Sequence, residues 1–268
     1  LIIYGLVADV SIGKMFMAGI LPGLLCCVLL MGATYLVAKR RGYRPARAAW
    51  PDRAETRRTL IGAWPALFLV VVIIGGIRLN VFTPTEAGAI GVVTVIVIGF
   101  LIFREMTIDD VVRALCETAK STAAVMVVIM ASSALAWIFS LEHAGDKLAA
   151  VIVEFTTNKY AFLMVVNALL LVLGMLIEGN AIMIVLVPLL MPVVRQLGID
   201  PVHFGIVLIL NLAIGCLTPP VGTVMLLVCN LAKVSVADFM RQSWPLFLAL
   251  FAALLLVTFV PFFSLALL

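Results

Sequence analysis

Long stretches without a charged residue constrain the fold of this chain more than any other feature. A helix of about 20 apolar residues is long enough to cross the ~30 Å hydrocarbon core of a bilayer. Because the stretches are continuously apolar rather than alternating, helices are favoured over a transmembrane barrel. Eight such stretches occur: Met15–Ala38, Thr59–Ile77, Ala87–Phe103, Ser121–Leu141, Tyr160–Ile177, Gly179–Val194, Phe204–Ala232 and Gln242–Leu268.

The composition agrees with a lipid environment. Of the 268 residues, 65% are hydrophobic and 12% are charged, whereas soluble domains average about 45–50% and about 25%. A soluble domain could not bury so much apolar surface, and disordered or nucleic-acid-binding chains need abundant charge. The five cysteines show no spacing typical of metal ligands. The sequence therefore predicts an all-α polytopic membrane protein.

Basic residues are concentrated between Lys39 and Thr59, where only Asp52 and Glu55 oppose them. A nucleic-acid patch is one interpretation, but between two spans the positive-inside rule explains the same pattern. We therefore expect a cytoplasmic loop, with attachment to anionic lipid headgroups as a second use. The basic residues are Lys39, Arg40, Arg41, Arg44, Arg47, Arg53, Arg57 and Arg58.

Two short patterns predict helix starts at the membrane surface. Thr107-x-x-Asp110 and Ser235-x-x-Asp238 each place a hydroxyl at an N-cap and a carboxylate three residues later. Apolar residues then recur at helical spacing. We expect helices that lie flat on the membrane, the first of them separate from the span that starts at Ser121.

The segment Ala161–Val194 is too long for one span. As a single helix it would measure ~51 Å, well beyond the hydrocarbon core. We expect two short limbs joined at Glu178, Gly179 and Asn180, which would form a re-entrant hairpin with its tip near mid-membrane. Two full spans joined by a surface turn at Glu178 are the alternative.

The segment Phe204–Ala232 contains a strong helix-breaking pattern. Two adjacent prolines remove backbone donors, and flanking glycines permit unusual dihedral angles. We expect half-helices near Phe204–Ile214 and Thr223–Leu231. Carbonyls freed at the break suit a small cation, and the second half-helix could bind an anion at its N-terminus. A structural proline kink is the alternative. The candidate binding residues are Gly215, Thr218, Pro219, Pro220, Gly222 and Thr223.

Isolated polar residues add candidates. Asn211 lies one turn before the break and Glu178 lies at the hairpin tip, and polar side chains buried in a membrane are functional by default. His203 follows Pro201 at the entrance of a span, and we interpret it as interfacial rather than catalytic.

The segment Thr83–Ala89 is also distinctive. Thr85 can cap a helix that starts at Glu86, whose carboxylate favours the positive end of that helix. This structural explanation suffices, so Thr83, Thr85 and Glu86 are weak binding candidates.

Several of these motifs together resemble one family. Phe82–Ala89 (FTPTEAGA), Met191-Pro192 followed by Gly198–Gly205 (GIDPVHFG), and Leu217–Gly222 (LTPPVG) resemble the large membrane subunit of tripartite ATP-independent periplasmic (TRAP) transporters. The resemblance runs from Leu1 to Leu268.

The resemblance implies a non-enzymatic permease of the bacterial or archaeal inner membrane that works as an elevator. Such a permease imports small organic acids, of the dicarboxylate or sugar-acid type, with sodium as the coupling ion and no cofactor. Its implied partners are a small membrane subunit and a periplasmic substrate-binding protein. Family sodium sites use backbone carbonyls and hydroxyls, here those of the hairpin tip at Glu178–Asn180 and of the break at Gly215–Thr223.

The family fold also implies a domain organisation with two inverted repeats. Ser11 with Pro22 echoes Ser235 with Pro245, and we expect the chain to be a fragment that holds mainly the second repeat. The expected parts are residues 1–14 (tail of the first-repeat broken helix and an outer interfacial segment), 15–59 (a span and the basic loop) and 60–268 (the second repeat). Within the last part we expect scaffold helices at 60–141, the hairpin at 161–194, the broken helix at 204–232 and a final helix at 244–268.

Three other functions compete with this one. A one-component sodium/carboxylate symporter would have a similar architecture. A membrane-embedded enzyme would need a catalytic set, but neither H-E-x-x-H nor G-x-S-x-G occurs. A scaffold protein would leave the Thr-Pro-Pro break without a purpose.

Overall fold

The computed structural model describes residues 1–43, 52–79, 81–142, 147, 150 and 158–268. The chain forms two compact units. Unit 1 comprises Leu1–Gly42 with Val125–Leu268, and unit 2 comprises Tyr43–Ala124. Arg44 and Arg47 of the expected basic loop lie outside the described residues.

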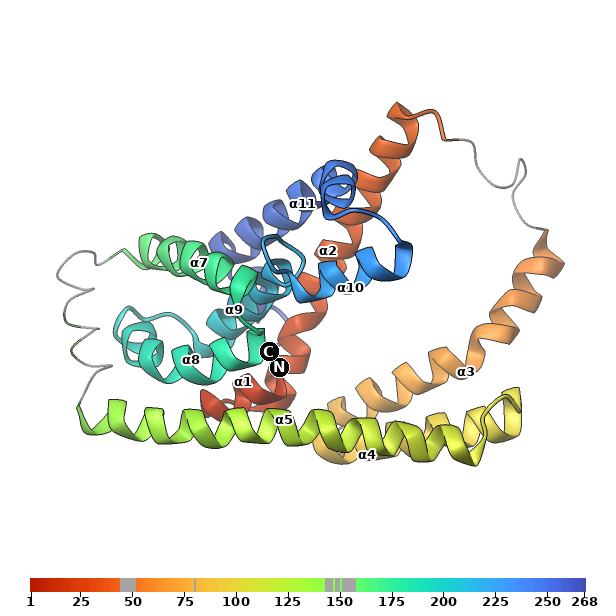
Figure 1. The fold of residues 1–268 in the computed structure, drawn as a ribbon, viewed down its shortest axis with the longest axis horizontal. Coiled ribbons are helices and arrows are strands. Elements are labelled where there is room, and N and C mark those ends of the chain that lie inside the picture. Colours follow the sequence, from red (N-terminus) through yellow and green to blue (C-terminus); the bar gives the residue numbers. More distant parts are fainter. Residues whose placement is uncertain (44–51, 80, 143–146, 148–149, 151–157) are drawn as a thin grey trace. The chain divides into compact units, whose positions relative to one another are not determined.

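All secondary structure in the described residues is helical (Figure 1). The helices are α1 (Ile2–Val7), α2 (Ile12–Arg40), α3 (Arg53–Arg78), α4 (Pro84–Val97), the π-helix η1 (Ile98–Phe103), α5 (Ile108–Leu141), α7 (Lys159–Leu176), α8 (Gly179–Gln196), α9 (Pro201–Gly215), α10 (Thr223–Ala232), α11 (Val236–Phe259) and α12 (Phe262–Leu265).

Seven helices in the described part of the chain are long and apolar enough to cross a membrane. They are Ile12–Arg40, Arg53–Ile77, Pro84–Phe103, Ile108–Ala131, Lys159–Leu176, Gly179–Gln196 and Val236–Phe259. Many of their large apolar side chains are exposed, as a lipid environment requires. The prediction of an all-α polytopic membrane protein is confirmed.

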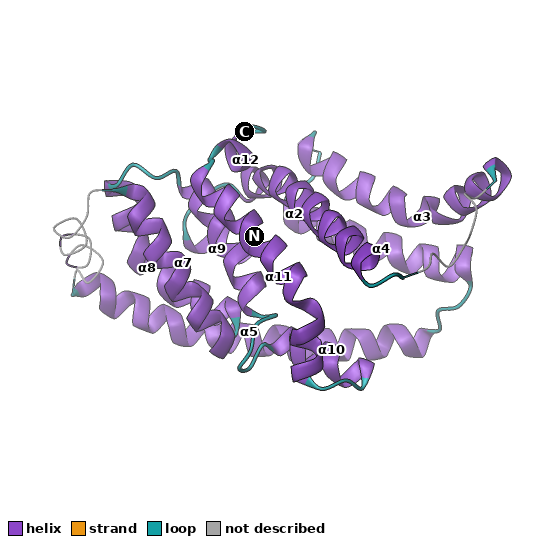
Figure 2. Ribbon diagram, turned by 90° about the horizontal axis from the view of Figure 1, so that it is seen from above, coloured by secondary structure: helices purple, strands orange, loops and turns teal. Residues whose placement is uncertain are grey.

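The core of unit 1 forms where α9 is surrounded by α2, α7, α8 and α11 (Figure 2). Phe204 and Leu208 of α9 are fully buried there, together with Leu170 of α7. Tyr4 of α1 is also fully buried, and its hydroxyl donates to the carbonyl oxygen of Pro201 at 2.6 Å. Buried apolar area and this hydrogen bond hold α1 to the start of α9.

Helices α2 and α11 pack against each other in opposite directions. At one end, Arg41 after α2 donates to the side-chain oxygen of Gln242 near the start of α11. At the other end, Leu254 near the end of α11 shares the buried core with Met15 near the start of α2. Figure 1 shows α11 in blue beside α2 in red. Opposite directions are what two inverted repeats predict for this pair.

The two helices of this pair also begin alike. Ser11 caps α2 by accepting a hydrogen bond from the Lys14 N–H, and Ser235 caps α11 by accepting one from the Asp238 N–H. Each helix contains one proline, Pro22 or Pro245. The capping predicted for Ser235 is thereby confirmed, and so is that of Thr107, which accepts from the Asp110 N–H at 3.3 Å. The surface helix expected after Ser235 is not separate from the final helix expected at 244–268, because α11 runs without interruption from Val236 to Phe259.

In unit 2, α4 begins earlier than the sequence predicts. Thr83, not Thr85, is the N-cap residue, and Pro84 occupies the first turn. Proline suits this position because its φ is already helical and its missing N–H would have no helical partner. Thr83 and Glu86 form a reciprocal capping box, with Glu86 N to Thr83 Oγ1 at 3.3 Å and Thr83 N to Glu86 Oε2 at 2.8 Å.

Helix α5 differs from the expected surface helix followed by a separate span. It runs without interruption from Ile108 to Leu141. The sequence between these residues contains neither proline nor glycine, so no residue breaks the hydrogen-bond ladder at Ser121. The capping signal predicted the start of the helix correctly, but the division at Ser121 was wrong.

The two anomalous segments are interrupted where the sequence predicts. Helix α7 ends at Leu176 and α8 begins at Gly179, with Ile177 in an extended conformation. Helix α9 ends at Gly215 and α10 begins at Thr223. The half-helices run slightly beyond the expected bounds near Phe204–Ile214 and Thr223–Leu231.

Candidate functional site

Helices α7 and α9 lie side by side and run in the same direction. Asn167 of α7 is hydrogen-bonded to Asn211 of α9, and further along both helices the backbones meet at Gly174 and Gly215. A Cβ atom added to Gly215 would lie 2.9 Å from the Cα of Gly174. Only glycine at both positions permits this approach, which brings the ends of α7 and α9 to one level.

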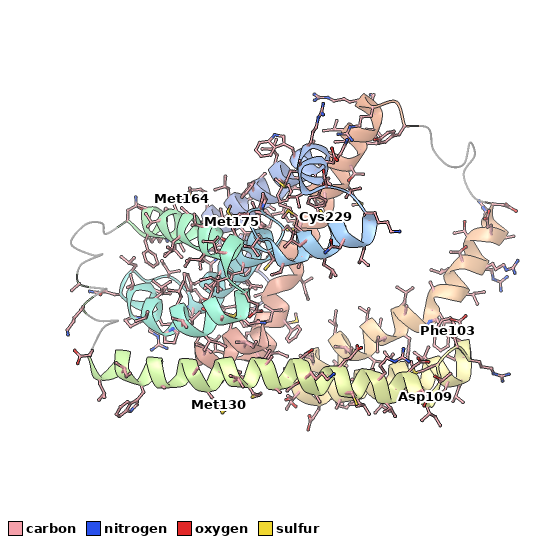
Figure 3. All side chains as sticks on the ribbon, viewed as in Figure 1. Phe103, Asp109, Met130, Met164, Met175 and Cys229 are labelled. Carbon is pink, nitrogen blue, oxygen red and sulfur yellow. The ribbon has the colours of Figure 1, made fainter. Side chains whose placement is uncertain are left out.

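The loop Cys216–Gly222, here called the break loop, is bonded to the end of α7. The backbone N–H groups of Val221 and Gly222 donate to the carbonyl oxygen of Met175 at 3.2 and 3.3 Å (Figure 3 labels Met175). Gly222 has a positive φ of 44°, and a Cβ there would lie 2.8 Å from the Thr218 carbonyl oxygen. The Pro219–Pro220 peptide bond is cis.

The hairpin tip at Glu178–Asn180 also lies beside the end of α9. Gly179, the first residue of α8, packs on Leu212 of α9, where an added Cβ would lie 3.6 Å from the Leu212 Cβ. The structure therefore brings together the two regions that the sequence nominates separately: the tip at Glu178–Asn180 and the break loop.

The carboxylate of Glu178 is already engaged at this tip. Its Oε2 accepts a hydrogen bond from the Ala181 N–H at 3.3 Å and caps α8, while its Oε1 accepts one from Asn180 Nδ2 at 2.6 Å. The Glu178 side chain is exposed and Asn180 is half-buried. A capping role thus accounts for the contacts of Glu178.

The first turn of α10 has a partner as well. Its Val224 and Met225 N–H groups donate to the carbonyl oxygen of Cys216 at 3.2 and 3.4 Å. These donors are therefore not free for the anion that the sequence analysis placed at this helix start. Thr223 is exposed beside them.

Oxygen acceptors are abundant in the break loop. In the described residues, no backbone N–H donates to the carbonyls of residues 217–221. Thr218 is buried, and its hydroxyl donates to the Ile214 carbonyl oxygen at 2.8 Å, which leaves its oxygen lone pairs as acceptors. Such carbonyl and hydroxyl oxygens are the ligands that small hard cations prefer.

A buried polar network adjoins the break loop. Asn211 is fully buried, and its Nδ2 donates to the backbone oxygen and to Oδ1 of Asn167 at 2.9 and 2.8 Å. Asn167 Nδ2 donates to Thr258 Oγ1 at 2.9 Å, and Thr258 Oγ1 donates to the Leu254 carbonyl oxygen at 2.7 Å. The network joins α9, α7 and α11. Within the described residues, Oδ1 of Asn211 has no partner.

The sequence analysis nominated Asn211 but missed Asn167 and Thr258. Asn167 is the one amide inside the uncharged run Tyr160–Ile177, a signal of the kind that selected Asn211. Thr258 carried no comparable signal, because an isolated threonine in an apolar helix is common.

His203 lies at the start of α9, as expected for the entrance of a span, and its side chain is buried within the protein. It is 3% exposed, and its Nδ1 lies 2.6 Å from Ser264 Oγ of α12. It lines a small cavity of about 140 Å³ at the start of α7 and α9, far along both helices from the break loop. Its contacts connect α9 to α12 and give it no place at the candidate site.

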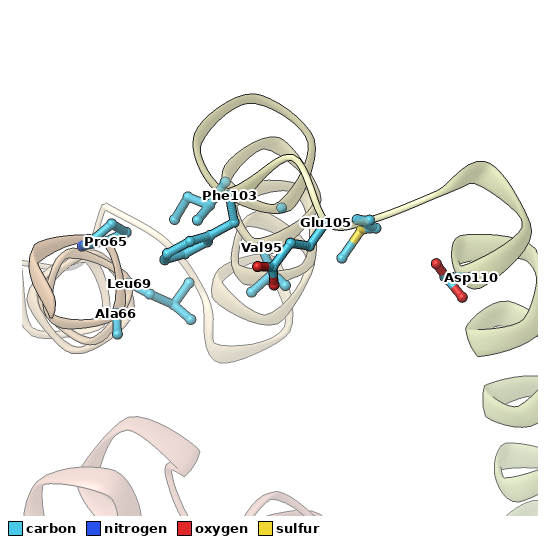
Figure 4. A pocket seen from close by; sticks show the side chains of 10 residues that line it. Pro65, Ala66, Leu69, Val95, Phe103, Glu105 and Asp110 are labelled. Carbon is cyan, nitrogen blue, oxygen red and sulfur yellow. The ribbon is translucent and has the colours of Figure 1, made fainter. Parts of the chain in front are cut away.

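The weak candidates Thr83, Thr85 and Glu86 belong to unit 2. The capping box accounts for Thr83 and Glu86, and Thr85 is exposed. Unit 2 also holds a cavity of about 510 Å³, which is lined by Leu69 of α3, Phe103 of η1 and other apolar side chains together with Glu105 and Asp110 (Figure 4). Apolar side chains predominate there, so we do not place the candidate site in this unit.

No group of three or more His, Cys, Asp or Glu side chains that could hold a metal occurs in the part of the chain that the structure describes. The oxygens near the break loop belong instead to backbone, hydroxyl and amide groups.

Comparisons with known proteins agree with this architecture. Over residues 1–263 the chain matches the family described as tripartite ATP-independent periplasmic transporter, DctM component. It is 40% identical over 267 residues to the sialic acid TRAP transporter large permease protein SiaM of Vibrio cholerae, covering 100% of this chain and 62% of the relative.

Two further relatives are similar over nearly the whole chain. The C4-dicarboxylate TRAP transporter large permease protein DctM of Pseudomonas aeruginosa is 34% identical, over 100% of this chain and 62% of its own length. The 2,3-diketo-L-gulonate TRAP transporter large permease protein YiaN of Escherichia coli is 33% identical, over 97% and 61%. The chain thus spans about three fifths of these relatives, and it belongs to the DctM family of TRAP transporter large permease proteins.

Proposed function

We propose that this chain is part of a permease subunit that imports small organic acids across the bacterial inner membrane. The convergence of the hairpin tip and the break loop on the ends of α7 and α9 carries this proposal. Relatives are named for sialic acid, C4-dicarboxylates and 2,3-diketo-L-gulonate, which are all organic acids. The proposed partners are a small membrane subunit and a periplasmic substrate-binding protein, as the name of the family suggests.

We propose further that the hairpin is re-entrant. Helix α11 begins shortly after α10 and reaches, at its other end, the first turn of α7, where the ring centroids of Phe259 and Tyr160 lie 5.7 Å apart. The tip and the break loop meet between these two ends. The 24 residues of α11 extend about 36 Å, whereas the 15 residues of α9 extend about 22 Å. A tip at that level lies within the membrane thickness that α11 spans.

We propose sodium as the coupling ion, and the charges at this point support a cation. Helices α7 and α9 both direct their C-terminal ends, which carry partial negative charge, toward the tip and the break loop. The opposing positive ends of α8 and α10 already have acceptors, Glu178 and the Cys216 carbonyl. The remaining field favours a cation, and the carbonyls of residues 217–221 with Thr218 are the proposed ligands. We propose that the complete permease carries the ion and the substrate across the membrane in an elevator motion.

Uptake by the complete protein tests the proposal. The full complex, reconstituted in vesicles, should import a radiolabelled organic acid only with its binding protein and a sodium gradient. Replacing sodium by potassium should abolish uptake, as should Thr218→Val or Gly222→Ala while the complex still assembles. Uptake without a binding protein would favour the one-component symporter. Sodium-independent uptake would contradict the coupling, and full uptake by both variants would contradict the site.

A further inference from the structure

Exposed cations from separate parts of the sequence gather at one end of unit 1. The hydrogen bond from Arg41 to Gln242 places the end of α2 beside the start of α11. Lys39 and Arg40 precede Arg41, and Arg241 precedes Gln242. Lys233 follows α10 just before α11 begins. We call Lys39, Arg40, Arg41, Lys233 and Arg241 the basic end; all five residues are exposed.

Little negative charge opposes these cations. In residues 39–42 and 232–244, Asp238 is the one acidic residue. Its carboxylate accepts a hydrogen bond from the Ser235 hydroxyl at 2.6 Å, as part of the cap of α11. Within these two segments the cations therefore outnumber the carboxylates, and the position of the one carboxylate is fixed by its capping role.

Aromatic side chains mark the depth of the basic end in a membrane. Tyr35 of α2 is 66% exposed and lies one turn before Lys39, and Trp244 of α11 is 55% exposed and lies three residues after Arg241. Helix α2 ends at the basic end whereas α11 begins there, so in both helices the aromatic residue lies about 4.5–6 Å inward from the cation. Charge, then aromatic ring, then apolar run is the order of residues across a headgroup layer.

We propose that the basic end binds the headgroups of anionic phospholipids in the cytoplasmic leaflet. That leaflet is the one to which the positive-inside rule assigns a cluster of Lys and Arg. An anionic headgroup supplies phosphate oxygens to this cluster of exposed cations, and Trp244 and Tyr35 hold the same end at headgroup depth. The association of α2 with α11 creates this site, because neither segment alone has more than three of the five cations.

Fluorescence quenching tests the site without any measurement of transport. The complete permease complex is placed in lipid nanodiscs with equal fractions of brominated phosphatidylglycerol or brominated phosphatidylcholine. The emission of Trp244, obtained by subtracting the Trp244→Phe variant, reports which lipid lies beside it. Phosphatidylglycerol should quench more strongly. The variant Lys39→Gln/Arg40→Gln/Arg241→Gln should lower this preference at least about tenfold, since each cation near an anionic surface contributes about fivefold.

A matched control removes three charges from the opposite end of unit 1. The variant Lys14→Gln/Lys159→Gln/Arg195→Gln should retain the preference. Because basic residues also direct membrane insertion, a second arm uses the unchanged protein: about 1 M salt shortens the screening length to about 3 Å and should weaken the preference. Equal quenching by the two lipids in the unchanged protein, or a preference that persists in both the triple variant and high salt, would overturn the proposal.

Discussion

Two glycines set the distance between the helices that form the candidate site. Gly174 and Gly215 allow α7 and α9 to touch backbone to backbone, beside the bond from the break loop to Met175. A single methyl group added at this contact would have to displace one of the two helices, because the neighbouring atoms belong to the backbone and cannot move aside as a flexible side chain can.

Gly215→Ala should therefore destabilise the complete permease by about 1–3 kcal/mol, the usual cost of overpacking, and should reduce sodium-dependent uptake. Thermal unfolding and vesicle uptake measure the two effects. Gly23→Ala in α2 is the control, because an added Cβ there meets nothing within 4 Å. Its stability should be unchanged or slightly raised. Equal behaviour of the two variants would argue against the close contact.

The Asn167 network makes a second prediction at this scale. Asn167→Leu removes the bonds to Asn211 and Thr258 and leaves buried polar groups without partners, at an expected cost of about 1–3 kcal/mol. In a double-mutant cycle with Asn211→Leu, the two costs should be clearly less than additive, because both substitutions break the same bonds. Strictly additive losses of unfolding free energy would show that the residues do not interact.

At the scale of the element, caps and breaks decide where helices start and stop. Thr83 and Glu86 form a complete capping box, so α4 needs both for its first turn. This structural role explains why Thr83 and Glu86 occur in the sequence without any role in binding.

Thr83→Ala should cost about 1 kcal/mol of stability and should leave the substrate concentration for half-maximal uptake unchanged. Thr85→Ala, two residues along and outside the capping box, should affect neither quantity. The measurement pairs thermal unfolding with an uptake titration. A large change in the half-maximal concentration for Thr83→Ala would restore this segment as a binding candidate.

Local signals explain which elements could be predicted from the sequence. The Pro219-Pro220 break and the Thr107 and Ser235 caps are encoded within a few residues, and the structure has them in place. The joint expected at Ser121 was wrong because a change from polar to apolar sequence does not interrupt a helix that lacks proline and glycine. The Asn167–Asn211–Thr258 network joins residues 44 to 91 positions apart, and its pairing depends on a helix register that no local pattern contains.

At the scale of the whole molecule, the antiparallel pair α2–α11 lies within one compact unit. A cross-link between Arg41→Cys and Gln242→Cys, in a background without native cysteines, should form readily with a flexible bifunctional thiol reagent, because two long side chains that meet at their tips leave the Cα atoms too far apart for a direct disulfide. Because both residues belong to unit 1, the cross-linked complex should still transport. Gel mobility and uptake measure the two outcomes.

Lys14→Cys with Gln242→Cys is the matched control, because Lys14 lies at the opposite end of α2 and should not cross-link. Efficient cross-linking of this control pair would contradict the antiparallel arrangement. Loss of transport specific to the Arg41–Gln242 cross-link would mean that α2 and α11 move relative to each other.

The chain of hydrogen bonds that ends at Leu254 has a fixed polarity. A helix carbonyl can only accept a hydrogen bond, so the Thr258 hydroxyl must donate to it. Asn167 Nδ2 must then donate to Thr258, and Asn211 Nδ2 must donate to Asn167. Neither side-chain amide can exchange its oxygen and nitrogen by rotation without breaking this series of hydrogen bonds. The atom of the Asn211 amide that is left without a partner in the described residues is therefore its oxygen, Oδ1, and not an N–H. This buried oxygen attracts cations and repels anions, so Asn211 is not expected to bind the carboxylate of the proposed organic acid.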